Sequence, residues 1–159
     1  MHRVIGIDPG SRKTGYGIIE ISNSGIAYVA SGNISVADQV FPRRLGVIYS
    51  EILELIVAYG VREMSIEEVF VAKNPNSALK LGQARGVAIA AGVAKDLEIF
   101  EYAARQVKKT IVGKGGASKS QIQHMVRVLL NLPGAPQADA ADGLALALCH
   151  AHISSKVTK

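Results

Sequence analysis

A short apolar segment near the start of the chain constrains the fold more than any other feature. Residues 3–8 form an apolar run that stops at Asp8, and Pro9 and Gly10 follow directly. An apolar run of this length, closed by a turn signal, is typical of a buried central strand. The segment therefore predicts a strand that delivers Asp8 to its carboxyl end.

The segments that follow predict a mixed sheet. Residues 14–21 and 25–34 are rich in β-branched and aromatic residues and are separated by a Ser-Asn-Ser-Gly turn, so they should pair as a hairpin beside the first strand. Two further strands are predicted at residues 64–71 and 97–102. We expect an α/β fold with a five-stranded mixed sheet, an antiparallel three-strand meander plus two parallel strands, and helices on both faces.

Apolar residues at intervals of three and four predict the helices, and several boundaries carry start signals. Asn74 is suited to be an N-cap, and Ser118 with Gln121 forms a capping box. The predicted helices run from Pro42 to the stop at Gly60, from Pro75 to Lys95, from the last strand to about Ile111, from Ser118 to Pro133 after the Gly-rich loop 113–117, and from about Ala138 to Ile153.

The helix that starts at Pro75 has little side-chain bulk. Gly82 and Gly86 lie one turn apart among several alanines, which permits close approach to a sheet or to another helix. Lys80 and Arg85 exclude a membrane-dimer motif. Tight packing inside the chain is the first expectation, and a subunit contact is the second.

Length and composition bound the class of protein. The 159 residues fit one globular domain, which we assign to residues 1–159. No apolar stretch approaches the roughly 20 residues of a bilayer span, and Asp8 and Pro9 interrupt the N-terminus before a signal-peptide core is complete. The single Cys149 lies among apolar residues and is interpreted as a buried structural thiol. These features favour the cytoplasm, with no membrane partner.

The positive charge is concentrated in one part of the chain. The formal net charge is +5, and no Asp or Glu occurs from Tyr102 to Ala138. A polyanionic partner is the natural inference, although charge alone fits a solvated basic face equally well. The cations of this stretch are Arg105, Lys108, Lys109, Lys114, Lys119 and Arg127.

Acidic residues supply the complementary signal. Asp139 and Asp142 are three residues apart at the start of the last helix, so they point to one face, where the helix N-terminus favours their ionised form. Taken alone, ordinary first-turn acids explain such a pair equally well. Glu67 and Glu68 form a costly pair inside a predicted buried strand, and strand alternation does not choose between them.

Convergence of these acids would demand a cation. Carboxylates about 5 Å apart repel by about 3 kcal/mol per pair at an effective dielectric near 20. Four such groups must either protonate or hold cations, and all-oxygen ligands suit Mg²⁺ or Mn²⁺ rather than Zn²⁺. Two-metal phosphodiester cleavage needs such a cluster, because one ion lowers the pKa of the attacking water and the other stabilises the leaving oxygen.

Five sequence blocks between residue 3 and about residue 152 resemble the RuvC Holliday-junction resolvases in order and spacing. The blocks are GIDPGSRKTGYG, SIEEVFVAKNPNSALKLGQARG, FEYAARQVKK, KSQIQHMV and PQADAADGLALAL. The resemblance implies an RNase H-like fold, a homodimer, and symmetric Mg²⁺-dependent nicking of two strands of like polarity at a four-way DNA junction. It also implies 5′-phosphate and 3′-hydroxyl ends, a role in recombination and repair, and work with the RuvAB branch-migration complex. Family members often carry a longer basic tail, which leaves truncation of this chain open.

The resemblance also assigns residues. It selects Glu67 over Glu68 and makes four carboxylates the ligands of two Mg²⁺ ions, for which Mn²⁺ can substitute: Asp8, Glu67, Asp139 and Asp142. It places Lys108 and Lys119 near the scissile phosphate, with Lys119 in the catalytic set, and Phe70 against bases at the crossover, where core packing is the competing interpretation. The remaining expected DNA contacts are Arg85, Arg105, Lys109 and Lys114.

Two other classes of function stay open at this point. The DPGS hairpin also resembles the phosphate loop of actin-like ATPases and sugar kinases, but those proteins need a second lobe, and GKGGASKS does not fit the Walker pattern. A junction-binding module without catalysis would explain the basic stretch but not the acidic residues. His150 and His152 diverge on a helix and are interpreted as incidental.

Overall fold

The computed structural model describes residues 1–69 and 74–157. Its strands are β1 (His2–Asp8), β2 (Lys13–Ser22), β3 (Gly25–Ser35), β4 (Glu63–Glu67) and β5 (Glu98–Tyr102). Its helices are α1 (Phe41–Tyr59), α2 (Pro75–Val93), α3 (Ala104–Val112), α4 (Lys119–Leu129) and α5 (Ala138–Val157). None of the helices in these residues is long and apolar enough to span a membrane.

The five strands form one mixed sheet in the order β3-β2-β1-β4-β5. β1 pairs antiparallel with β2, which pairs antiparallel with β3, so the first three strands form the expected meander. On its other side β1 pairs parallel with β4, and β4 pairs parallel with β5. The predicted α/β architecture is therefore confirmed, with β1 at the centre.

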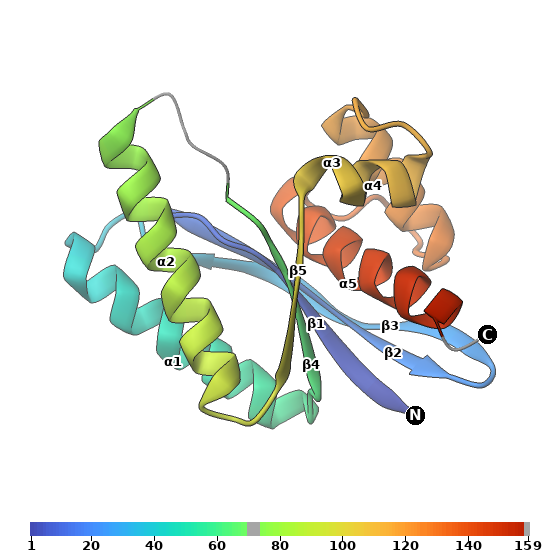
Figure 1. The fold of residues 1–159 in the computed structure, drawn as a ribbon, viewed down its shortest axis with the longest axis horizontal. Coiled ribbons are helices and arrows are strands. Elements are labelled where there is room, and N and C mark those ends of the chain that lie inside the picture. Colours follow the sequence, from blue (N-terminus) through green and yellow to red (C-terminus); the bar gives the residue numbers. More distant parts are fainter. Residues whose placement is uncertain (70–73, 158–159) are drawn as a thin grey trace.

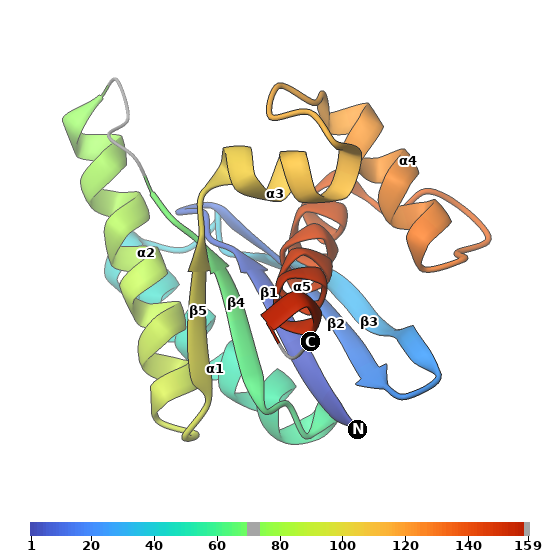
Figure 2. The same cartoon turned by 45° about the vertical axis from the view of Figure 1, so that its right-hand side comes forward.

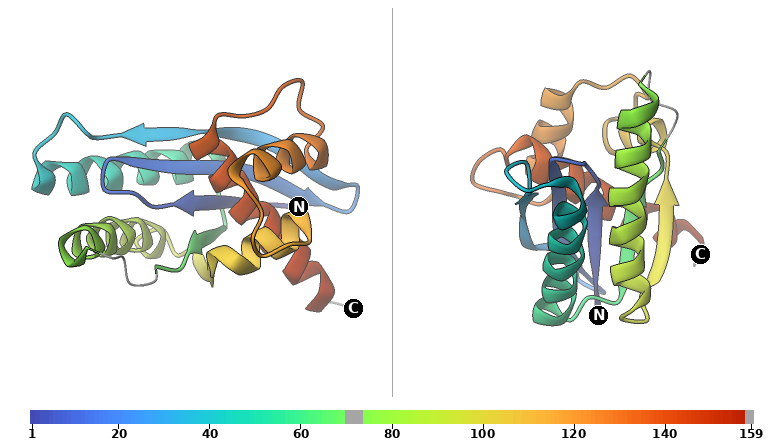
Figure 3. Two further views of the ribbon diagram at one scale, coloured as in Figure 1. Left: turned by 90° about the horizontal axis from the view of Figure 1, so that it is seen from above. Right: turned by 90° about the vertical axis from the view of Figure 1, so that its left-hand side faces the viewer.

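Helices cover both faces of the sheet. Figure 1 shows α1 and α2 on one side and α3, α4 and α5 on the other, and Figure 2 shows α5 crossing the sheet over β1 and β2. The view from above in Figure 3 shows α1 and α2 towards the left and α3, α4 and α5 towards the right, with the strands running across both groups. Each layer encloses its own apolar cluster, one beneath α1 and α2 and one around α5.

Alternation along the strands assigns residues to these two layers. In β1, Ile5 and Ile7 belong to the cluster beneath α1 and α2, whereas Val4 belongs to the cluster around α5. In β4, Met64 and Ile66 likewise face α1 and α2. Asp8 in β1 and Glu67 in β4 therefore share the α5 face of the sheet, because side chains two residues apart along a strand point the same way.

Most predicted boundaries are confirmed within one or two residues, and the cap signals explain why. Gly60 ends α1 in the left-handed conformation at φ 60°, and the Asn74 side chain caps α2 by accepting from the Asn76 amide. Ser118 and Gln121 form both hydrogen bonds of the capping box. Cys149 is fully buried, as expected.

Three predicted boundaries are wrong. β4 ends at Glu67 rather than at residue 71, because β1 leaves the pairing at its Asp8-Pro9-Gly10 turn; one more backbone bond, from the Glu68 amide to the Tyr102 carbonyl, follows. α4 ends at Leu129 rather than at Pro133, and Asn131 turns the chain with φ 51°. α5 continues four residues beyond the predicted end, to Val157.

The glycines of α2 do not do what the sequence suggested. A Cβ atom added to Gly82 or Gly86 would meet nothing within 4 Å, so neither glycine is needed for close packing within the chain. Only Gly92, near the end of α2, packs tightly, against the side chains of Met64 and Ile99. The first expectation for Gly82 and Gly86 is therefore wrong, and the second, a subunit contact, stays a prediction.

Candidate active site

Glycines bring the start of α5 into backbone contact with the sheet. A Cβ atom on Gly17 would lie 2.4 Å from the Leu144 nitrogen, and one on Gly143 would lie 2.4 Å from the Tyr16 carbonyl carbon. A Cβ atom on Gly6 would lie 2.0 Å from the Gly143 carbonyl oxygen. Only glycine fits such an approach, which sets the acidic first turn of α5 directly over the end of β1.

The turn after β1 is held by its own hydrogen bonds. The Thr14 hydroxyl is fully buried, donates to the Gly10 carbonyl at 3.3 Å and lies 3.4 Å from the Gly10 amide. From outside, the Arg44 guanidinium donates to the Ser11 carbonyl at 3.2 Å and to the Ala37 carbonyl at 3.1 Å. These contacts fix the backbone that carries Asp8.

Three of the four predicted carboxylates converge. Asp8, Glu67 and Asp142 line one cavity of about 230 Å³. Glu67 and Asp142 both act on the Asp8 carboxyl group, because each of them shifts its pKa. Glu68 is not among the lining residues, so the face of β4 that points to α5 selects Glu67 from the ambiguous pair.

The cavity pairs these acids with cations and an apolar wall. Lys108 from α3 and Lys119 from α4 complete its polar lining. The Lys119 Nζ atom lies 3.8 Å from Asp142 Oδ2, and its side chain is 78% exposed. Such an exposed, long contact contributes little to stability, which leaves the ammonium free to meet another anion. The apolar lining consists of Ala104, Val107, Ile122, Ala145 and Leu146.

Crowding of the carboxyl groups shifts their pKa values upward. Burial, then the charge of Glu67 and a hydrogen bond to it, raises the pKa of Asp8 to about 7, against smaller opposing effects of Asp142 and Lys119. Burial and the charge of Asp8 raise the pKa of Asp142 to about 6, with Lys119 opposing and Asp139 adding to the rise. Asp8 and Asp142 therefore bind protons at a higher pH than isolated carboxyl groups do.

Asp139 sits beside this group but not in the cavity lining. Its charge contributes to the raised pKa of Asp142. Its backbone carbonyl oxygen packs against Gly15, where a Cβ atom on the glycine would lie only 2.1 Å from that oxygen. The structure therefore gathers three of the predicted acids around the cavity and holds the fourth one helical turn away from Asp142, towards β2.

The other predicted DNA contacts lie around this centre in different settings. Arg85 is only 19% exposed and binds within the chain, donating to the Glu67 carbonyl at 2.9 Å and to the Glu101 carboxylate. Arg105 and Lys114 are exposed, and the Arg105 stem packs against Gly115. Lys109 lies on another side of α3, in a recess that includes His152. Phe70 lies outside the described residues.

The donor set fits a hard divalent cation. Within residues 1–69 and 74–157, no three His, Cys, Asp or Glu side chains are arranged to hold one ion together. The three acids of the cavity nevertheless offer only oxygen atoms as ligands. By donor type and by position these residues fit Mg²⁺ or Mn²⁺, and rotation of the side chains must complete the coordination.

The sequence interpretation missed the polar residues behind the cavity. His150, interpreted as incidental, is 2% exposed and lies between the Tyr102 hydroxyl, 2.7 Å from Nδ1, and Glu63 Oε2, 2.9 Å from Nε2. His152 does point elsewhere, to the Leu148 carbonyl. The available signal was a histidine inside an apolar helix, because a buried imidazole needs partners.

Comparison with known proteins agrees with this geometry. The family model "Crossover junction endodeoxyribonuclease RuvC" matches residues 4–150. A protein of that name from Dichelobacter nodosus is 59% identical over 150 residues, which cover 94% of this chain and 85% of the relative. One from Serratia proteamaculans is 57% identical and covers 98% of this chain and 90% of the relative.

Solved structures extend the agreement to the fold. T. thermophilus RuvC in complex with a Holliday junction superposes with a TM-score of 0.91 at 28% identity, over 99% of this chain and 98% of that one. The yeast mitochondrial Holliday junction resolvase Ydc2 shares the fold with a TM-score of 0.72 at 13% identity, over 99% of this chain and 80% of that one. The expected RNase H-like α/β fold is thereby confirmed.

The family model spans almost the whole chain, and relatives of nearly the same length are more than half identical. This chain therefore belongs to the RuvC family of crossover junction endodeoxyribonucleases, which are metal-dependent nucleases.

Proposed function

We propose that residues 1–159 form a single nuclease domain that resolves Holliday junctions by symmetric, Mg²⁺-dependent nicking of two strands of like polarity. The products would carry 5′-phosphate and 3′-hydroxyl ends that a ligase can rejoin during recombination and repair. One observation carries the proposal: Asp8, Glu67 and Asp142 line one cavity together with Lys108 and Lys119, and the pKa values of Asp8 and Asp142 are raised there.

The carboxylates would hold the metal and orient the reacting groups. Asp8, Glu67 and Asp142 supply oxygen ligands from β1, β4 and α5, and Asp139 adds a fourth from the first turn of α5. Two bound Mg²⁺ ions, replaceable by Mn²⁺, would lower the pKa of the attacking water and stabilise the leaving oxygen. The apolar wall of the cavity restricts water around the scissile phosphate.

The cations would bind the DNA backbone. Lys119, the fifth proposed catalytic residue, stands beside Asp142 and would neutralise the phosphate as charge builds up on it. Lys108 approaches from α3. Arg105, Lys109 and Lys114 would extend the contact along the arms, and Phe70 would stack on bases at the crossover. Arg85 would contribute by holding the Glu67 backbone.

Symmetric cleavage requires two copies of the site, and we propose a homodimer. Large apolar side chains are exposed on the α1 and α2 layer: Val57 is 64% exposed, Leu79 67% and Val93 57%. The open surface over Gly82 and Gly86 lies on the same helix as Leu79 and Val93. Cooperation with the RuvAB branch-migration complex and a cytoplasmic location follow from the same family role.

A cleavage assay with three DNA forms tests the proposal. The protein is incubated with a synthetic four-way junction, a plain duplex and a single strand, each with Mg²⁺ or with chelator. We expect paired nicks at symmetric positions in the junction alone, ligatable ends, and no product with chelator. Equal cleavage of the plain duplex would refute junction selectivity, and ATP hydrolysis without nicking would favour the kinase-like alternative.

A further inference from the structure

The polar contacts between β4 and α5 continue beyond the cavity. The Ser65 hydroxyl donates a hydrogen bond of 2.7 Å to the Leu146 carbonyl. Farther from the cavity, Glu63 Oε2 lies 2.9 Å from His150 Nε2. Ser65, Glu63 and His150 do not line the cavity, so the proposed chemistry leaves these three residues without a role.

These pairs share a repeat with the catalytic acids. Counting back from Glu67 in steps of two reaches Ser65 and then Glu63, and counting forward from Asp142 in steps of four reaches Leu146 and then His150. Two strand residues span about 6.6 Å and four helical residues about 6 Å, so β4 and α5 stay in step over three successive pairs. The matched spacing makes the contact specific for one alignment of helix and strand.

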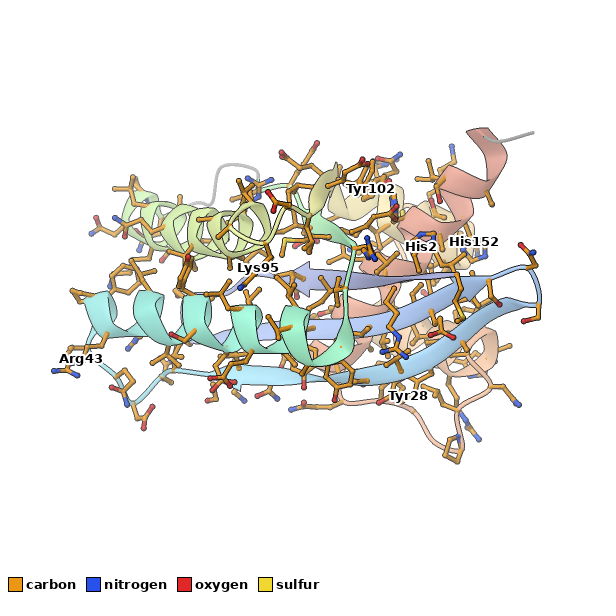
Figure 4. All side chains as sticks on the ribbon, turned by 90° about the horizontal axis from the view of Figure 1, so that it is seen from below. His2, Tyr28, Arg43, Lys95, Tyr102 and His152 are labelled. Carbon is orange, nitrogen blue, oxygen red and sulfur yellow. The ribbon has the colours of Figure 1, made fainter. Side chains whose placement is uncertain are left out.

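The environment of the two pairs makes that alignment strict. Ser65 is 0% exposed and His150 2% exposed, so a shift of α5 would leave buried polar groups without partners. The Tyr102 hydroxyl holds His150 Nδ1 at 2.7 Å, and the Phe100 ring lies 4.2 Å from the imidazole centroid. Glu63 Oε2 has a second contact, with His2 Nε2 at 3.2 Å. Figure 4 shows Tyr102 and His2 at the end of the molecule where α5 lies, far from Arg43.

The hydrogen bonds add directional contacts to the packing of α5 on the sheet. Gly6, Gly17 and Gly143 set how closely α5 approaches the sheet, but they have no side chains that interlock along the helix axis. Directional bonds to side chains of β4 resist movement along that axis. A slide of about 1 Å would move Asp142 relative to Glu67 and Asp8, and metal sites tolerate only a few tenths of an ångström in ligand distance.

We propose that Ser65 and the Glu63–His150 pair are positioning residues, which hold α5 in the one alignment with β4 that lets Asp142 bind a divalent cation together with Asp8 and Glu67. The inference rests on the proposed function and adds the residues that tune its metal affinity. Residues that orient metal ligands through hydrogen bonds typically change metal affinity or activity by 10–100-fold when replaced.

Ser65→Ala tests the proposal, because it removes one hydroxyl and leaves the Leu146 carbonyl within its helix. Calorimetric titration of the purified protein with Mg²⁺ should give about tenfold weaker binding, with a matching rise in the Mg²⁺ concentration for half-maximal nicking. Nicking at saturating Mg²⁺ and junction affinity in chelator should stay near wild type. Glu63→Gln should change Mg²⁺ binding in the same direction and serves alone if Ser65→Ala does not fold.

Ile52→Val is the matched control for a loss of stability alone. Ile52 is fully buried on the inner side of α1, over the opposite face of the sheet, so its truncation lowers the Tm without touching the contact between β4 and α5. Wild-type Mg²⁺ affinity in both positioning variants, or equal weakening in Ile52→Val, would overturn the inference. Failure of the wild-type protein itself to bind Mg²⁺ would instead refute the proposed function.

Discussion

The two faces of the sheet are built from the same strands in opposite ways. Beneath α1 and α2, side chains such as Ile5, Ile7 and Ile66 are fully buried and fill the space between strand and helix. Beneath the start of α5, Gly6 and Gly17 remove the side chains and let backbone meet backbone. One face is filled with apolar side chains that stabilise the fold. The other face lacks side chains at these glycines, so α5 comes close to the sheet and charged groups lie together.

Adjacent residues of one strand therefore do opposite work. Ile7 is 0% exposed and belongs to the apolar cluster, whereas Asp8, its neighbour, has its pKa raised to about 7 by burial and by Glu67. A raised acid pKa in the folded state means that gathering the acids lowers stability at neutral pH. The apolar face must therefore offset the stability that the folded protein loses by bringing the acidic side chains together.

Replacing one residue of each kind should separate the two faces most strongly. Asp8→Asn should lower nicking by about a thousandfold or more, equivalent to about 4 kcal/mol of barrier, while junction binding is kept. Ile7→Val should nick at a rate near wild type and lose about 1 kcal/mol of stability. Single-turnover nicking, junction gel shifts and denaturant unfolding of both variants measure these effects. Substantial residual nicking by Asp8→Asn would remove this carboxylate from the reaction.

The cost of the acidic face should be visible as a pH dependence of stability without metal. In the unfolded chain an Asp has a pKa near 3.9, whereas in the folded protein the pKa is about 7 for Asp8 and about 6 for Asp142. Between about pH 4 and pH 7 the folded protein therefore binds more protons than the unfolded chain. Stability in chelator should therefore fall as pH rises from about 4 to 7. At pH 8 Asp8→Asn should exceed wild type by about 2–4 kcal/mol, and near pH 4 the two should match.

Mg²⁺ should reverse that difference. At pH 8 the cation should raise the Tm of the wild-type protein and have much less effect on Asp8→Asn, because it binds ionised carboxylates. Thermal unfolding across pH, with chelator or with Mg²⁺, provides the measurement. Wild-type stability that rises between pH 4 and 7 in chelator would show that the acids are not crowded in the folded state.

Glycine substitutions directly probe the face on which α5 lies close to the sheet. Gly17→Ala would place a Cβ atom 2.4 Å from the Leu144 nitrogen, so we expect a loss of about 1–3 kcal/mol and weaker Mg²⁺ binding as α5 is displaced. Gly46→Ala, in α1, meets nothing within 4 Å and should gain about 0.5–1 kcal/mol from helix propensity. Urea unfolding distinguishes the two, and equal effects would mean that α5 yields without strain.

The fold followed from local signals in the sequence wherever a signal was strong. Gly60, Asn74 and the capping box at Ser118 each end or start a helix where predicted, because a cap is satisfied by neighbours in sequence. The end of β4 was missed, because it depends on where β1 leaves the sheet. Strand length is set by the partner, which a single segment does not reveal.

The site was predictable in part for a similar reason. Strand ends and the first turn of a helix expose carboxylates by local rules, so Asp8 and the pair Asp139 and Asp142 could be named as candidates in advance. Choosing Glu67 over Glu68 needed the family motif or the face of β4. Ser65 carries no local signal, and His150, a histidine inside an apolar helix, indicates only that it needs partners and not which ones. Their meaning comes only from the alignment of α5 on β4, which is a property of packing.

The smallest predicted effect compares two exposed lysines on opposite sides of the sheet. Lys119 lies beside Asp142 at the cavity, and Lys95 follows α2 on the other layer, where Figure 4 labels it. In an Asp8→Asn background, which binds without cutting, junction affinity should fall with salt at a logarithmic slope near −5 if about six phosphates are neutralised. Lys119→Ala should reduce the magnitude of that slope by about 1, and Lys95→Ala should leave it unchanged. Equal slopes for the two variants would mean that the DNA does not approach the α5 face, and a flat salt response would remove the basic face from binding altogether.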